Sequence, residues 1–209
     1  MPLVELTFAR HGQTQKNIDG VLQGHLDTSL NEKGLEDAKK LSECIKNFKF
    51  DVIFSSDLTR ALQCANKIRK HFPNTEFVKE PLLRERNFGY HQGKKLTDLG
   101  YSDLSYTTMV KHLYQCECPH GETNNQVINR IKRFMEKCFN EYDGKKILVV
   151  THGGIVMLAL NYIFGEIPIF KNRREHDNCD VSYVKISNDL ELFDSLVNIH
   201  CKILAEREA

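Results

Sequence analysis

The sequence predicts an α/β protein with a mostly parallel sheet, because short apolar runs alternate along the chain with longer segments of helical periodicity. A second observation is that two of the apolar runs, 3–9 and 145–154, end abruptly in a histidine and glycine. In open sheets of this kind, ligands bind outside the carboxyl ends of the strands. The sequence therefore predicts a fold class and also the edge of the sheet where a site forms.

Each element is expected from its own pattern. The expected strands are 3–9, 51–56, 76–81, 145–154 and two late runs, VSYVKIS and LELFDSLV, joined by NDLE. The expected helices, with apolar residues at helical spacing, are 31–48, 57–72, 121–142 and 155–165. Asp57 stands where an acidic side chain caps the second of these helices. Because repeats, low-complexity tracts and Pro/Gly-rich linkers are missing from the sequence, we expect a single domain over 1–209.

Composition excludes several classes of function. The chain has 209 residues, a formal net charge of +1 and 41% hydrophobic residues, which is enough for a sizeable core. A neutral balance provides no basic field for nucleic acid or an anionic membrane, so neither is expected as a partner. Seven cysteines without a repeating spacing indicate reduced thiols. With no secretory signal and no apolar run of about 20 residues, we expect a cytoplasmic protein.

A cluster of anion-binding side chains is expected at the predicted edge. Arg10 and His11 adjoin at the end of the first strand, where two cationic groups make sense together only around an anion. Arginine offers a forked set of donors suited to phosphate oxygens, and Gly12 allows the backbone to turn closely around a ligand. The candidates that follow the later strands are Arg60, Glu85 and His152. His11 and His152, far apart in sequence, are thus expected to be neighbours.

Each later candidate also has an ordinary structural interpretation. Arg60 can be a surface residue of an amphipathic helix, and Glu85 can pair with the arginines on either side of it. His152, on a glycine-flanked turn, can be a capping residue. The combination of all these residues at strand ends favours the functional interpretation.

Two further groups of residues are weaker candidates. The motif CECPH offers three metal ligands, Cys116, Cys118 and His120, but no second cluster at zinc spacing completes a site, so we expect no metal. His120 is instead expected near the rim of the site, with Glu122 starting the long helix. The second group is the basic segment KNRRE, whose cations are Lys171, Arg173 and Arg174. These side chains either contact a second anionic group of the substrate or belong to a solvated loop.

The ordered motifs RHGQT, LQGHLDTSLNEKG, FSSDLTRALQCA, LRERNFG, PHGET and VVTHGG resemble the histidine phosphatase superfamily, also called the phosphoglycerate mutase-like family. The resemblance implies a three-layer sandwich in which helices cover both faces of a mostly parallel sheet. It implies that His11 is the nucleophile that becomes a phosphohistidine, and that Glu85 is the proton donor and then the base. The residues that it assigns to the phosphate are Arg10, Arg60, His152, Asn17, the backbone around Gln23 and Gly24, and Gly153.

Chemistry supports this assignment independently of the family. Phosphoryl transfer needs mainly positioning and charge stabilisation, which two arginines and a second histidine supply without a metal or another cofactor. An imidazole attacks only when it is neutral, so we expect a carbonyl acceptor to hold the tautomer of His11. An alkoxide is a poor leaving group, and a carboxylic acid is needed to protonate it.

The expected activity is metal-independent hydrolysis of phosphomonoesters of small metabolites, either sugar phosphates or glycolytic intermediates. The family's mutases have paired arginines in a segment after the glutamate motif, whereas YTTMVKHLYQCEC contains none. LRERNFG and PHGET resemble the small phosphatase branch that includes the p53-induced glycolysis regulator and fructose-bisphosphatase-type members. The alternatives are cofactor-dependent phosphoglycerate mutase activity and, from another class, a non-catalytic phosphate-binding regulator.

The sequence departs from the pattern of that branch at two positions. Gln13 stands where Glu is common, and Gln92 stands where the motif usually has Glu-Gly, which removes a carboxylate near the site. Lys94 and Lys95 follow directly and favour a substrate with more than one anionic group. The partner expected is therefore a small phosphorylated metabolite, bound by a monomer or a dimer.

Overall fold

The computed structural model describes residues 1–100, 118–164, 177–189 and, as backbone only, 192–199. Within these residues, six strands form one sheet in the order β3-β2-β4-β1-β5-β6. The strands are β1 (Leu3–Arg10), β2 (Val52–Ser55), β3 (Glu76–Lys79), β4 (Lys146–Thr151), β5 (Val181–Ser187) and β6 (Leu192–Ile199). The first four are parallel, and β5 pairs antiparallel with both β1 and β6. The predicted mostly parallel sheet is confirmed.

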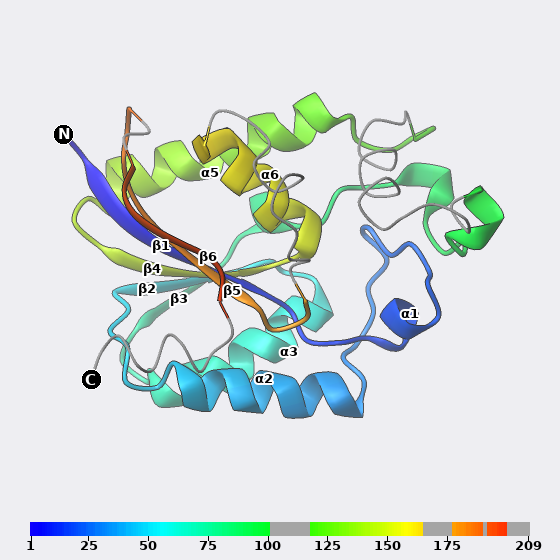
Figure 1. Cartoon of the computed structure of the whole chain (residues 1–209), viewed down its shortest axis with the longest axis horizontal. Helices are drawn as coiled ribbons and strands as arrows, with labels where there is room; N and C mark the ends of the chain where they lie inside the picture. Colours follow the sequence, from blue (N-terminus) through cyan, green and yellow to red (C-terminus); the bar gives the residue numbers. More distant parts are fainter. Residues whose placement is uncertain (101–117, 165–176, 190–191, 200–209) are drawn as a thin grey trace.

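Helices cover both faces of this sheet. The α-helices are α1 (Gln15–Ile18), α2 (Glu32–Cys44), α3 (Thr59–Ile68), α5 (Asn124–Glu141) and α6 (Gly153–Phe164). The described part of the chain also contains four short 3-10 helices, which are η1 (Arg69–His71), η2 (Pro81–Leu83), η3 (Gly89–His91) and η4 (Thr97–Leu99). Helices α5 and α6 lie on one face and α2 and α3 on the other (Figure 1). This is the three-layer arrangement that the family resemblance implies.

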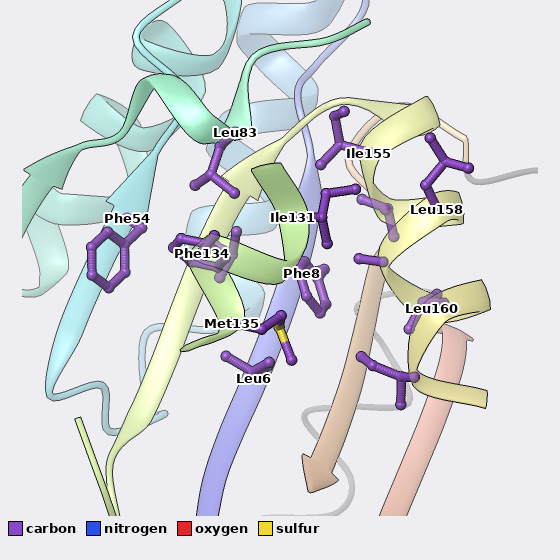
Figure 2. Close-up of a cluster of buried hydrophobic side chains, with 14 of the residues drawn as sticks. Leu6, Phe8, Phe54, Leu83, Ile131, Phe134, Met135, Ile155, Leu158 and Leu160 are labelled. Carbon is purple, nitrogen blue, oxygen red and sulfur yellow. The ribbon is translucent and has the colours of Figure 1, made fainter. Parts of the chain in front are cut away.

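The core consists of two apolar layers, one on each face of the sheet. Leu6 and Phe8 of β1 pack against Phe134 and Met135 of α5 (Figure 2). Ala9, the next residue of the strand, belongs to the opposite layer under α2 and α3. This alternation follows from the two-residue period of a strand whose two faces are both covered. Burial on both faces anchors the strand ends at which the functional residues begin.

Two predicted helix starts are wrong, because in each case an acidic side chain has another partner. Asp57 does not cap the second predicted helix, which begins at Thr59 after Leu58 as its cap. Its carboxylate instead accepts a hydrogen bond from Arg84 Nε at 2.7 Å. Similarly, Glu122 lies before helix α5, and Thr123 is the cap.

Five of the seven cysteines lie among the described residues. They form no disulfide with one another, and they are Cys44, Cys64, Cys118, Cys138 and Cys179. Cys116 and Cys201 lie outside the described residues. Among the helices that the structure describes, none combines the length and the apolar character that a membrane crossing requires.

Candidate active site

The strand register brings the two histidines together. Strands β1 and β4 are parallel neighbours, and Arg10 at the end of β1 is paired with Thr151 at the end of β4. The residues that follow, His11 and His152, therefore leave the sheet side by side. Their ring centroids are 5.1 Å apart with an angle of 64° between the planes, and the side chains are 4% and 0% exposed. The predicted juxtaposition is confirmed.

The backbone sets the tautomer of His11. Its Nδ1 atom lies 2.7 Å from the carbonyl oxygen of Gly12, and a carbonyl can only accept, so Nδ1 donates its proton there. The lone pair is then on Nε2. Burial, together with the positive charges of Arg60 and Arg10, holds the pKa of His11 well below its usual range. The ring is therefore neutral near pH 7, and the expected carbonyl acceptor is confirmed.

Arg60 joins this cluster to the loop that follows α1. The side chain is 1% exposed on α3, and its Nη1 and Nη2 atoms donate to the carbonyl oxygens of Leu26 at 2.8 Å and Gly24 at 2.7 Å. Its Nε atom is buried and has no hydrogen-bond partner among the described residues. Burial lowers the pKa of Arg60 to about 10, so the guanidinium stays charged at neutral pH. One buried N–H is thus available to a bound anion.

Arg10 lies over the turn that carries His152. A Cβ atom built on Gly153 would be 3.3 Å from Arg10 Nε, so the glycine allows the arginine side chain to pack on the backbone. Burial is the main cause of the lowered pKa values of His11, Arg60 and His152, and the positive charge of Arg10 lowers each of them further. Gly153 thus lies close to Arg10, and the contact expected between its N–H and the phosphate stays a prediction.

His152 has a partner that sequence reasoning missed. Its Nε2 atom lies 2.8 Å from the Oγ atom of Ser56, the first residue after β2, while Nδ1 is buried without a hydrogen-bond partner among the described residues. Burial is the main cause that holds the pKa of His152 well below its usual range, and the positive charge of Arg60 lowers it further. The signal for Ser56 was its position at the end of a strand adjacent to β4.

Glu85 lies just after η2 and faces the beginning of helix α6. Its Oε2 atom accepts a hydrogen bond from the N–H of Gly154 at 3.1 Å, and Oε1 accepts one from its neighbour's N–H, that of Arg86, at 2.8 Å. The side chain of Arg84 binds Asp57, and Arg86 Nε donates to the carbonyl oxygen of Glu122 at 2.7 Å. The carboxylate is therefore held against the turn that bears His152.

The residues expected to close over the phosphate fall into two groups. Gly24 is joined directly to the cluster through Arg60. Asn17 and Gln23 are joined to each other through Thr14, since Asn17 Oδ1 accepts from the Thr14 N–H at 3.0 Å and Gln23 Oε1 lies 3.1 Å from Thr14 Oγ1. Thr28 also donates to Gln23 Oε1, at 2.6 Å. The described hydrogen bonds do not link Asn17 or Gln23 directly to His11.

Gln92 has a role that its position in the motif did not reveal. Its Oε1 atom accepts a hydrogen bond from the backbone N–H of His25 at 2.6 Å, immediately after Gly24. Lys94 and Lys95 follow shortly after and are exposed, and the Lys94 carbonyl oxygen accepts a hydrogen bond from the Leu22 N–H at 3.0 Å.

The weaker candidates have the following locations. The rings of His120 and Tyr90 are 4.4 Å apart between centroids, and both side chains are exposed. The described residues contain no group of three or more His, Cys, Asp or Glu side chains suited to a metal ion. The basic loop with Lys171, Arg173 and Arg174, like Cys116, lies outside the described residues.

Comparison with known proteins agrees with this geometry. The model of the histidine phosphatase superfamily (branch 1) matches residues 6–198. The chain is 37% identical over 145 residues to fructose-2,6-bisphosphatase TIGAR B of Danio rerio, covering 64% of this chain and 52% of that protein. It is 29% identical over 196 residues to a metal-independent phosphoserine phosphatase of Arabidopsis thaliana, covering 92% and 81%. The structure of phosphoglycerate mutase from Bacillus anthracis shares the fold, with a TM-score of 0.80, 24% identity and coverage of 100% and 98%.

Proposed function

Because the chain belongs to branch 1 of the histidine phosphatase superfamily and is an enzyme of the phosphoric monoester hydrolase class, we propose that it hydrolyses phosphomonoesters of small metabolites through a phosphohistidine on His11. We propose that hydrolysis needs no metal, because two arginines can supply positive charge to a bound phosphate. Arg60 is buried in the site, and Arg10 adjoins His11. The observation that carries the proposal is the pair of buried, neutral imidazoles 5.1 Å apart beside these guanidinium groups.

The first half of the reaction transfers the phosphoryl group to the enzyme. The lone pair on His11 Nε2 attacks phosphorus, the bond from phosphorus to the leaving oxygen breaks, and protonated Glu85 gives its proton to that oxygen. An alcohol leaves, and the phosphoryl group remains on His11. The Nε N–H of Arg60 and the free nitrogen of His152 would stabilise the charge that spreads over the equatorial oxygens.

The second half returns the enzyme to its starting state. A water molecule attacks the phosphohistidine while ionised Glu85 takes one of its protons, and the bond between phosphorus and nitrogen breaks. Inorganic phosphate leaves, His11 recovers its lone pair, and Glu85 is again protonated. The hydrogen bond to Gly12 keeps the Nδ1 proton of His11 in place throughout, so the same tautomer serves both halves.

A rapid-quench experiment with radiolabelled substrate and chelator tests this proposal. The unmodified chain should hydrolyse sugar phosphates and phosphoglycerates with EDTA present and should form a base-stable, acid-labile phosphoenzyme. His11→Ala should abolish both turnover and labelling. His71→Ala is a matched control, since His71 takes no part in the site. Its Nε2 atom lies 3.3 Å from the Glu43 carboxylate. Turnover that requires added metal, or labelling that survives His11→Ala, would contradict the proposal.

The same experiment identifies the substrate class if it includes a wide panel of phosphorylated substrates. Hydrolysis is favoured over mutase activity because the segment YTTMVKHLYQCEC, which follows the glutamate motif, contains no arginine. We therefore propose that inorganic phosphate, and not an isomeric phosphoglycerate, is the product from 3-phosphoglycerate. Phosphorus NMR of the reaction mixture distinguishes the two products.

A further inference from the structure

We propose that His25 is a positioning residue for Glu85, which it holds through the backbone so that the carboxyl group meets the leaving oxygen. This inference rests on the proposed function and extends it to a residue that the site motif does not single out. The contact joins the loop beside the phosphate to the loop that carries the acid. His25 would therefore act on proton donation and not on phosphate binding.

The contact is a hydrogen bond to a main-chain acceptor. His25 Nε2 lies 2.8 Å from the carbonyl oxygen of Glu85, which can only accept, so Nε2 carries the proton. Arg130 Nη2 donates to the same oxygen from α5 at 3.1 Å. Two donors from separate parts of the chain thus hold the peptide bond that follows Glu85, and they restrict the direction of its carboxyl group.

The ring of His25 is itself set between fixed groups. Its backbone N–H donates to Gln92 Oε1 at 2.6 Å, and the preceding carbonyl, that of Gly24, accepts from Arg60 at 2.7 Å. The ring lies 3.9 Å from the Glu122 carboxylate, which Arg130 binds at 2.9 Å. Because these backbone contacts do not involve the ring, removing the ring leaves the loop attached to Arg60.

Because His25 would act on proton donation and not on phosphate binding, its effect should depend on the leaving group. An alkyl phosphate needs the acid, because an alkoxide leaves poorly, whereas p-nitrophenolate leaves without protonation. Loss of the His25 hydrogen bond should therefore slow hydrolysis of glycerol 3-phosphate and spare that of p-nitrophenyl phosphate. The parameter to compare is kcat/KM, since it reports the steps up to release of the alcohol.

The experiment compares His25→Ala, His25→Gln, Glu85→Gln and His71→Ala on both substrates. We expect His25→Ala to lower kcat/KM for glycerol 3-phosphate about fivefold, the effect of one lost hydrogen bond, and to change it less than about twofold for p-nitrophenyl phosphate. His25→Gln, whose amide nitrogen occupies the place of Nε2, should restore most of the alkyl rate. His71→Ala should match the unmodified chain on both. Thermal unfolding confirms that each variant is folded.

The outcomes separate this inference from the proposed function. Equal losses on both substrates, or no loss on either, would overturn the role of His25 even if Glu85→Gln shows the expected dependence on the leaving group. If Glu85→Gln itself shows no such dependence, the proposed acid is wrong and the inference fails with it. If His25→Ala is not folded, His25→Gln alone decides. The inference is then overturned if His25→Gln hydrolyses glycerol 3-phosphate as slowly as Glu85→Gln does.

Discussion

The Oγ atom of Ser56 lies 2.8 Å from Nε2 of His152, and both side chains are fully buried. A hydroxyl group has one proton to give, and the N–H of Leu58 already donates to this oxygen at 3.4 Å. We expect Ser56 to donate its proton to His152 Nε2, because this leaves the histidine proton on the nitrogen that faces no protein acceptor. His152 would then carry its own proton on Nδ1, the nitrogen that has no hydrogen-bond partner in the described chain. A donor N–H is what a phosphate oxygen requires.

Replacing Ser56 by alanine should therefore weaken binding of the transition state without breaking the fold. We expect Ser56→Ala to lower kcat/KM about tenfold and to raise the inhibition constant of inorganic phosphate, because His152 loses its preferred tautomer. Nitrogen-15 NMR of the imidazole should show the change of tautomer directly. Ser42→Ala is the matched control, since Ser42 is a buried serine of α2 that donates to the Lys39 carbonyl oxygen. An unchanged tautomer in Ser56→Ala would refute this role.

Burial of the two histidines predicts how stability depends on pH. The pKa of His11 in the folded chain is well below 6.5, so the unfolded chain binds more protons between those two values. The free energy of unfolding should thus be fully retained above pH 6.5 and fall as the pH decreases below it. The slope is up to about 1.4 kcal/mol per pH unit for one such group. Urea denaturation of the unmodified chain and of His11→Gln from pH 5 to pH 7 measures the difference in slope. A steeper slope in the variant would be incompatible with a buried neutral His11.

Arg60 should be sensitive even to replacement by lysine. The two outer nitrogens of Arg60 each donate to a carbonyl oxygen, of Leu26 and Gly24, while the buried Nε has no partner among the described residues and can donate to the anion. The three donors of a lysine ammonium group lie on one atom, so they cannot reproduce contacts that the guanidinium makes from three separate nitrogens. We expect Arg60→Lys to lower kcat/KM about 100-fold and to weaken vanadate binding similarly. Arg69→Lys is the control, since this arginine lies over the Phe77 ring away from the site. Near-normal vanadate affinity in Arg60→Lys would contradict the assignment.

The sequence predicted those features of the site that depend on regular structure. His11 and His152 were predictable as neighbours, because each ends an apolar run and parallel strands align their carboxyl ends. The carbonyl acceptor of His11 was predictable from the chemistry of an attacking imidazole. These inferences needed only strand periodicity and the requirements of phosphoryl transfer.

Contacts made by loops were not predictable, because they depend on the path of the backbone. His25 and Glu85 are 60 residues apart and meet only because the loops turn toward one another. Asp57 carries the signal of a helix cap, but Arg84, 27 residues later, competes successfully for its carboxylate. A local pattern cannot show such a competitor, so the helix start was misplaced.

Two glycines provide a direct test of whether the loop that contains Gly24 closes over the phosphate, as expected. Gly24 and Gly20 both have positive φ, +54° and +62°, so a side chain at either position costs about 1 kcal/mol or more in backbone strain. A Cβ atom on Gly24 would collide with Gln92 Oε1 and lie 2.8 Å from the Arg86 carbonyl oxygen, whereas one on Gly20 would meet nothing within 4 Å. We expect both alanine variants to lose a similar amount of stability from strain. Only Gly24→Ala should then lose activity, by about tenfold or more, because the loop must move away from Arg60. Steady-state kinetics at a temperature where both variants are folded measures this, and equal activities would show that the loop does not hold the phosphate.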